Sequence, residues 1–144
     1  MSHTNLTAEP VIIHTDGACT PNPGKGGWGV VLQYKTTIKE LSGSEDATTN
    51  NRMELRAAIN ALNALTKPCS VVLYSDSRYV IDGFTSWLPN WKKKGKTNYL
   101  NEDLWYELDQ AAARHSISWN WVKAHSGNPG NERADMLATT AINS

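Results

Sequence analysis

The feature that most constrains this chain is the stretch from Val11 to Gly29, which reads VIIHTDGACTPNPGKGGWG. It begins as a predicted β-strand, because a run of β-branched residues follows Pro10. Asp16 falls within this run, where a buried carboxylate needs compensation, usually from a cation. The prolines and glycines after Cys19 predict a turn that keeps the backbone close to whatever Asp16 faces. A solvated aspartate in a β-turn is the simpler interpretation, and both stay open at this point.

Strand and helix signals alternate along the rest of the chain. Apolar and β-branched runs predict strands over 28–34, 37–42, 70–75 and 117–122. Helical periodicity predicts helices over 51–65, 77–87, 102–114 and 131–142, and Pro89 interrupts the second of them. The first three strands are close enough in sequence for an antiparallel meander. This order predicts an α/β fold in which helices pack on the faces of a mixed sheet.

Size and composition predict one domain over residues 1–144, with a flexible N-terminus at 1–9. No apolar run approaches the roughly 20 residues of a membrane span, and the polar start lacks the apolar segment of a secretion signal. Cys19 and Cys69 are therefore expected to be free thiols of a cytoplasmic protein.

Three further acids stand near the ends of predicted elements. Glu54 falls in the first turn of its helix, Asp76 directly follows the 70–75 strand, and Asp135 falls in the first turn of the last helix. Each has a structural explanation, as a capping-box partner, a helix N-cap and an anion favoured by the helix dipole, respectively. Such positions nevertheless tend to meet at one edge of an α/β sheet, where converging carboxylates repel one another without cations. With Asp16 they predict an oxygen-rich site for Mg²⁺ or Mn²⁺.

The chain resembles the bacterial type 1 ribonuclease H family. The matching stretches are TDGACTPNPGKGGWG (15–29), TTNNRMEL (48–55), YSDSRYV (74–80), NWKKKG (90–95), NEDLW (101–105) and WVKAHSGNPGNERADMLA (121–138). They follow the family's order over nearly the whole chain. The resemblance implies the ribonuclease H-like fold, a five-stranded mixed sheet with an antiparallel meander, then parallel strands, and helices on both faces.

The resemblance also implies an activity, which is hydrolysis of the RNA strand of RNA–DNA hybrids to give 3′-hydroxyl and 5′-phosphate ends. It implies two Mg²⁺ ions in the substrate complex, with Mn²⁺ as a possible substitute. The expected partner is the hybrid itself, bound by a monomer that does not associate with membranes.

By the same resemblance, the four metal-binding carboxylates are Asp16, Glu54, Asp76 and Asp135. His125 matches the family's histidine in the loop before the last helix, and two glycines in HSGNPGN would let this loop move. Water orientation, proton transfer and product release stay open as roles for His125.

Residues that contact the hybrid are also implied. Those that sense the 2′-hydroxyl, the group that separates RNA from DNA, are Cys19, Asn22, Asn50, Asn51 and Arg78. Arg78 departs from the neutral amide of many members, and because guanidinium cannot accept a hydrogen bond we expect it to contact a phosphate or a base edge. Thr49 and Asn101 match residues that grip a phosphate of the DNA strand, although either could be a plain helix cap.

The net charge is zero, but lysines are concentrated in residues 90–100, here called the basic protrusion. Lys92, Lys93 and Lys94 lie beside Trp87 and Trp91, a combination that suits a nucleic-acid backbone and its sugars. A solvated charged loop is the usual alternative. In the family this element contacts the DNA strand, and here it is short.

Other functions stay open from the sequence. A hybrid-binding module without catalysis is disfavoured because all four acids are present, and a DNA-directed nuclease of the same fold is disfavoured by TTNNRME and the basic protrusion. A domain of a reverse transcriptase is also less expected, because no polymerase sequence accompanies it.

Overall fold

The computed structural model describes residues 9–144, so residues 1–8 of the expected flexible N-terminus lie outside the described part. The predicted five-stranded mixed sheet is confirmed, with strand order β3-β2-β1-β4-β5. The strands are β1 (Val11–Cys19), β2 (Gly24–Tyr34), β3 (Thr37–Thr48), β4 (Ser70–Ser75) and β5 (Ser116–Trp121). The helices are α1 (Asn50–Asn63), α2 (Arg78–Asp82), α3 (Leu88–Lys94), α4 (Glu102–Ala112) and α5 (Pro129–Ile142).

The central strand β1 extends past its parallel neighbours. β1 pairs with β2, and β2 with β3, in antiparallel register, whereas β1, β4 and β5 run parallel. The last pair between β1 and β4 joins Thr15 to Ser75, and Ser75 in turn pairs with Trp121 at the end of β5. Asp16 therefore lies beside the point where β4 and β5 stop, the edge at which parallel α/β sheets usually bind ligands.

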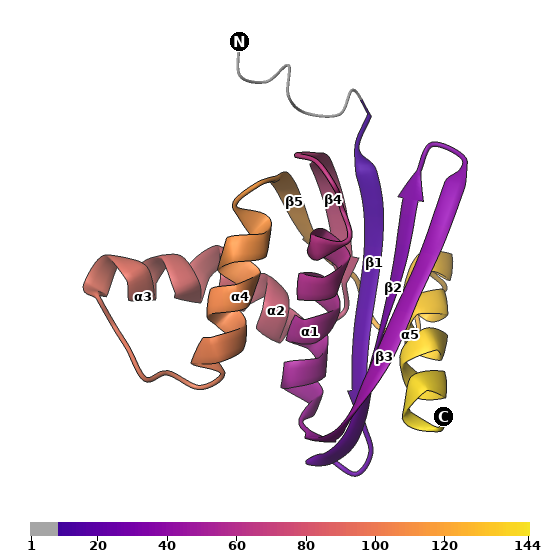
Figure 1. Cartoon of the computed structure of the whole chain (residues 1–144), viewed down its shortest axis with the longest axis horizontal. Coiled ribbons are helices and arrows are strands. Elements are labelled where there is room, and N and C mark those ends of the chain that lie inside the picture. Colours follow the sequence, from indigo (N-terminus) through magenta and orange to yellow (C-terminus); the bar gives the residue numbers. More distant parts are fainter. Residues whose placement is uncertain (1–8) are drawn as a thin grey trace.

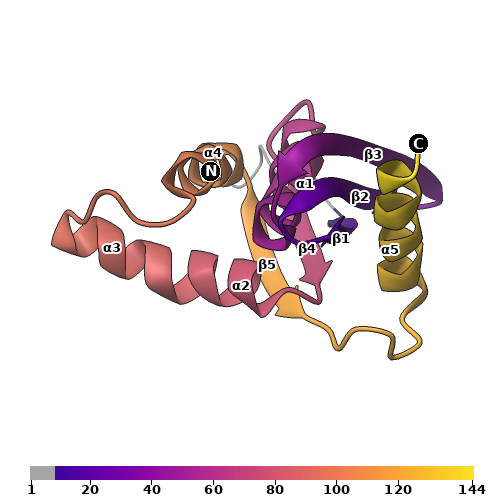
Figure 2. The ribbon, with the colours of Figure 1, turned by 90° about the horizontal axis from the view of Figure 1, so that it is seen from below.

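Helices cover both faces of the sheet. Figure 2 shows α5 on one side and α1 with α4 on the other. The main core lies under α1 and α4 and contains fully buried Ile13, Leu55, Leu73, Trp105 and Leu108. α3 extends away from the sheet at one end of the molecule (Figure 1). Among residues 9–144 no helix is long and apolar enough to cross a bilayer, and Cys19 and Cys69 are free thiols as expected.

The boundaries of β2 and β3 differ from the prediction. The prediction placed the start of β2 at residue 28, but β2 begins at Gly24, and β3 continues to Thr48 instead of ending at 42. The glycines that predicted a turn instead allow close packing: a Cβ on Gly27 would lie 2.3 Å from the carbonyl oxygen of Ala138 in α5. Glycine here serves a close approach of backbones within a strand.

Pro89 does not interrupt the helical segment, contrary to the prediction. A π-helical turn (Gly83–Trp87) joins α2 to α3, and Pro89 occupies the first turn of α3. Pro89 thus follows directly on the π-helical turn, and the helical backbone continues through it. The segment 90–98 is consequently helical up to Lys94, where Gly95 with a φ of +64° ends α3.

The remaining elements agree with the sequence within two residues at each end. β4 has the predicted bounds, whereas α1 and α4 both end two residues early. β5 is shifted by one residue, and α5 begins at Pro129 instead of 131.

Candidate active site

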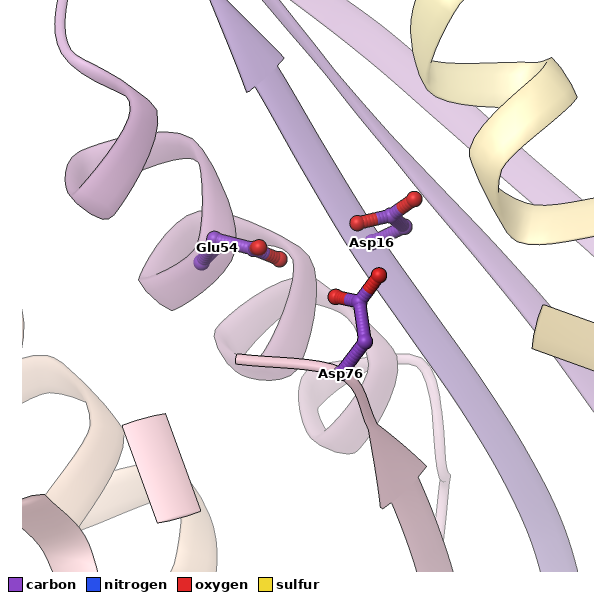
Figure 3. Close-up of side chains that lie close together, drawn as sticks. All are labelled: Asp16, Glu54 and Asp76. Atoms are coloured by element: carbon purple, nitrogen blue, oxygen red, sulfur yellow. The ribbon is translucent and has the colours of Figure 1, made fainter. Parts of the chain in front are cut away.

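Three of the four predicted acids meet at the carboxyl end of β4. Figure 3 shows Asp16, Glu54 and Asp76 pointing toward one another from β1, α1 and the residue after β4. Each offers a carboxylate oxygen, and these oxygens all lie within 4.8 Å of one another. These three residues are called the acidic cluster below.

The capping explanations for Glu54 and Asp76 are wrong. Thr49 is the N-cap of α1, where its side chain accepts from the N–H of Arg52, so Glu54 lies beyond the first turn. Ser77 caps α2 by accepting from the N–H of Val80. Neither carboxylate caps a helix, and both point toward Asp16 in the acidic cluster.

The acidic cluster is electrostatically unfavourable without a cation. Burial, then the charge of Asp76 and the contact with Asp135, raise the pKa of Asp16 to about 8, although the Gly17 amide donates to its Oδ1 at 2.9 Å. Burial and the charges of Asp16 and Asp76 also raise the pKa of Glu54 well above its usual value. Burial raises the pKa of Asp76 as well. Desolvation and like charge thus act together on all three groups.

Glu54 supplies a second sign of a missing partner. Its Oε1 is buried and, within residues 9–144, has no hydrogen-bond partner. Buried polar atoms are normally satisfied, so an orphan carboxylate oxygen aimed into an acidic cluster needs a ligand. An all-oxygen donor set of this charge fits Mg²⁺ or Mn²⁺.

Asp135 lies beside the cluster. Asn128 caps α5 through the N–H of Asn131, so Asp135 falls beyond the first turn, and the expected helix-dipole explanation is wrong. Asp135 is half-buried, and its contact with Asp16 helps to raise the pKa of Asp16. The α5 helix therefore brings a fourth carboxylate to the same edge of the sheet.

His125 is exposed in the loop between β5 and α5, with a φ of +55°. It lies near enough to Asp76 that its charge lowers the pKa of that carboxyl, against the effect of burial. The histidine is thus placed at the acidic cluster but outside its buried part.

Four of the five predicted 2′-hydroxyl residues, Cys19, Asn22, Asn50 and Asn51, gather between the β1–β2 turn and the start of α1, whereas Arg78 lies apart from them at the start of α2. Asn22 Oδ1 accepts from the N–H of Asn50 at 3.1 Å, and the Cys19 thiol contacts the carbonyl of Thr48. Asn51 follows in the half-buried first turn of α1. An open groove of about 520 Å³ adjoins them, lined by Pro23, Gly24, Ala47, Thr48, Thr49 and Arg52.

Asn101 is held in a hydrogen-bond network that reaches this groove. Its Oδ1 accepts from Arg52 at 3.1 Å, and its Nδ2 donates to the Tyr79 hydroxyl at 3.0 Å. Trp105 Nε1 donates to the same hydroxyl. Asn101 occupies the N-cap position of α4, but its side chain makes no cap bond and is engaged in this network instead.

The basic protrusion is more ordered than a charged loop. Trp91 is half-buried and stacks on Tyr99, with ring centroids 4.2 Å apart, and Trp87 packs edge-on against Tyr79. Lys92 forms an ion pair of 3.0 Å with Asp109. Lys93 and Lys94 are exposed and have no ion pair within residues 9–144. Two of the three lysines thus remain unneutralised, on the segment that projects away from the sheet (Figure 1).

Sequence reasoning missed Trp121. The guanidinium carbon of Arg78 lies 3.9 Å from the centroid of the Trp121 ring. The Nε1 of Trp121 donates to the carbonyl of Asp76 at 3.0 Å. Its place at the carboxyl end of the predicted last strand could have marked it, since the same argument placed Asp76 in the site.

Comparisons with known proteins agree with this geometry. The RNase H family model matches residues 8–143. A ribonuclease H of Alcanivorax borkumensis is 60% identical over 137 residues, covering 92% of this chain and 91% of the relative. One from Paramagnetospirillum magneticum is 54% identical over 147 residues, covering 99% and 96%.

Among solved structures, LC9-RNase H1, described as a type 1 RNase H with the type 2 active-site motif, superposes with a TM-score of 0.87 at 34% identity. That match covers 96% of this chain and 74% of the other. LC11-RNase H1, solved in complex with an RNA/DNA hybrid, superposes at 0.71 and 24% identity, covering 92% and 96%. The second likeness concerns the fold alone.

Proposed function

Because this chain belongs to the ribonuclease H family, we propose that it hydrolyses the RNA strand of RNA–DNA hybrids and leaves 3′-hydroxyl and 5′-phosphate ends. The observation that carries the proposal is the acidic cluster, with three carboxylate oxygens within 4.8 Å at the sheet edge. The working unit is one domain over residues 1–144, acting as a monomer.

Asp16, Glu54, Asp76 and Asp135 are assigned to hold two divalent cations, Mg²⁺ or in its place Mn²⁺. When bound, such cations supply an activated water and stabilise the leaving 3′-oxygen. The protein contributes preorganised carboxylate oxygens from β1, α1, α5 and the end of β4. The raised pKa values of Asp16, Glu54 and Asp76 support this role, because a cation relieves the repulsion that raises them.

His125 is assigned to proton handling. It is exposed beside Asp76, where it can take a proton from water or deliver one to the leaving oxygen without being buried in the cluster. The carboxylates need no covalent role, so hydrolysis proceeds by direct attack of water on the phosphodiester.

The hybrid is held by two surfaces. Cys19, Asn22, Asn50 and Asn51 line the approach between the β1–β2 turn and α1, where they would meet the RNA strand. Thr49 and Asn101 border the adjoining groove, which would take a phosphate of the DNA strand. The basic protrusion, through Trp87, Trp91 and its lysines, would extend the contact along that strand.

One assay tests the proposal. A labelled RNA–DNA hybrid is incubated beside single-stranded RNA, double-stranded RNA and double-stranded DNA of the same sequence, with Mg²⁺ or with chelator. We expect cleavage of the RNA in the hybrid alone, and none in chelator. Binding without cleavage would indicate a hybrid-binding module, whereas cleavage of double-stranded DNA would indicate a DNA-directed nuclease.

A further inference from the structure

Arg78 differs from every other arginine of the chain in its partners. Arg52 pairs with Asp103, Arg56 with Glu107, and Arg133 with Glu40. Arg114 donates to the backbone carbonyls of Leu62 and Leu65. Within residues 9–144, Arg78 alone among the arginines has neither an ion pair nor a hydrogen bond to an acceptor. Its guanidinium is therefore left without an ion-pair partner, on a residue two positions after Asp76 of the acidic cluster.

The exposed Arg78 side chain nevertheless has one defined partner. Its guanidinium lies over the ring of Trp121, with 3.9 Å between the guanidinium carbon and the ring centroid. Such stacking engages the face of the guanidinium and leaves the N–H groups on its edge free to donate. An arginine whose guanidinium plane is stacked on a ring, with the N–H groups on its edge free, can donate two parallel hydrogen bonds to one acceptor group. Phosphate accepts such a pair of hydrogen bonds.

Trp121 connects this guanidinium to the site. It ends β5 opposite Ser75, and its Nε1 donates to the carbonyl of Asp76 at 3.0 Å. The ring that carries Arg78 is thus anchored to the backbone of a residue in the acidic cluster.

We infer that Arg78, stacked on Trp121, forms a preformed phosphodiester-binding fork at the edge of the acidic cluster, with Trp121 as its positioning residue. The inference rests on the proposed function for the identity of the ligand, a backbone phosphate of the hybrid. Base-edge contact by Arg78, which the sequence left open, is the competing outcome.

The test measures binding of a labelled RNA–DNA hybrid in chelator as a function of salt, and kcat and KM in Mg²⁺. Arg78→Gln should weaken binding by about 10-fold, as expected for a charged hydrogen bond. It should also lower the log–log salt slope by about one unit, because one phosphate contact is lost. Lys67→Gln is the matched charge control, since it removes an exposed cation at the other end of β4 and should leave the slope unchanged.

The positioning role is tested at Trp121. Trp121→Leu should weaken hybrid binding by about 3-fold, the worth of an exposed cation–π contact. Trp121→Phe keeps a ring face and should restore most of that loss. Trp119→Phe, on the same face of β5 but packed on Phe84, is the control and should not alter the salt slope. If Trp121→Leu does not fold, Trp121→Ile replaces it, because a β-branched residue suits a strand.

Several results would overturn the inference. An unchanged salt slope in Arg78→Gln, with altered cleavage-site preference, would show that Arg78 contacts a base edge. Equal affinity of Trp121→Leu and the parent would remove Trp121 from its role. A parent protein that binds the hybrid but does not cleave it would refute the proposed function. The binding measurements in chelator would still test whether Arg78 and Trp121 form a phosphate-binding fork.

Discussion

Asp16 is the residue on which the cluster's electrostatics turn, because burial and two neighbouring acids raise its pKa from 3.8 to about 8. The folded protein without metal therefore holds a proton at Asp16 that the unfolded chain has already lost. Between these two pKa values the native state binds more protons, so the free energy of unfolding falls as the pH rises. Metal binding reverses this, since it displaces the proton and neutralises the charge.

Through Asp16 alone, we expect the metal-free protein to lose up to about 1.4 kcal/mol of unfolding free energy per pH unit as the pH approaches 8. Asp16→Asn should remove this contribution and leave those of Glu54 and Asp76. The variant should therefore gain stability over the parent at high pH but not near pH 5, which is about one unit above the pKa of Asp16 in the unfolded chain. Cleavage should be lost in the same variant. Denaturant unfolding in chelator measures the effect, and Asp46→Asn, an exposed carboxyl on β3, is the control. A stability difference independent of pH would contradict the assignment.

His125 combines an exposed imidazole with a left-handed backbone conformation. Replacing it should lower kcat by about 10² to 10⁴-fold, the usual worth of a positioned proton-transfer group. His125→Ala removes the ring, and His125→Asn removes it while keeping a residue that tolerates positive φ. Both variants should lose rate alike and keep the parent's metal affinity by titration calorimetry. Near-native activity of the Asn variant would assign the effect to the backbone, and weaker metal binding would make His125 a ligand.

At the scale of elements, the lysines of α3 are expected to contribute to binding of the hybrid and not to the chemical step. Lys93 and Lys94 are exposed and unpaired within the described residues, whereas Lys92 is held by Asp109. The helix projects away from the sheet that carries the acidic cluster (Figure 1). Its contacts should therefore be the same in the ground and transition states, which raises KM on removal without changing kcat.

Replacing Lys93 and Lys94 together with Ala should raise KM for the hybrid and lower the salt slope by about two units, one for each phosphate contact. Lys92→Ala should have a smaller effect, because this lysine must first leave Asp109. Asp109→Asn frees Lys92 and should strengthen binding. Steady-state kinetics at several salt concentrations provide the measurement, and an unchanged KM in the double variant would identify the segment as a solvated helix only.

The elements also show what sequence patterns can and cannot predict. β4 was predicted to its ends because Ser70–Ser75 is a short apolar run closed by a polar residue. The start of β2 could not be predicted, because glycine occurs both in turns and in strands where two backbones pack closely. The effect of Pro89 on the helix was predicted wrongly, because nothing in the sequence pattern indicates the π-helical turn before it.

Within the site, the meeting of Asp16, Glu54 and Asp76 could be predicted, because motif spacing and the end of the 70–75 strand mark these residues. The stack of Arg78 on Trp121 and the network from Arg52 to Tyr79 could not. Both join residues from elements far apart in sequence, and single-sequence periodicity carries no information on such pairs.

At the scale of the whole molecule, the site draws on both faces of the sheet. Glu54 comes from α1 on one face and Asp135 from α5 on the other, with Asp16 in the strand between them. Surface ion pairs link these layers, including Arg56 to Glu45 and Glu107. Exposed pairs contribute little each, so the seating of the helices depends mainly on packing.

Helix α5 packs closely on strand β2. Gly29 of β2 pairs with Asp16, and a Cβ on Gly29 would lie 2.3 Å from the carbonyl oxygen of Ala134, the residue before Asp135. Gly29→Ala should therefore displace α5 and carry Asp135 away from Asp16. We expect a loss of about 1–3 kcal/mol in unfolding free energy, typical of overpacking.

The same variant should lose kcat in excess of any loss of folded protein, because a displacement of about 1 Å at a catalytic group can cost about 10²-fold in rate. Ser42→Ala is the matched control, since Ser42 pairs with Gly29 from the exposed side of β3 and should change neither quantity. Thermal unfolding and active-fraction-corrected kinetics measure the two effects. If Gly29→Ala is destabilised but keeps its kcat, the position of α5 does not control the site, and Asp135 is not a working member of it.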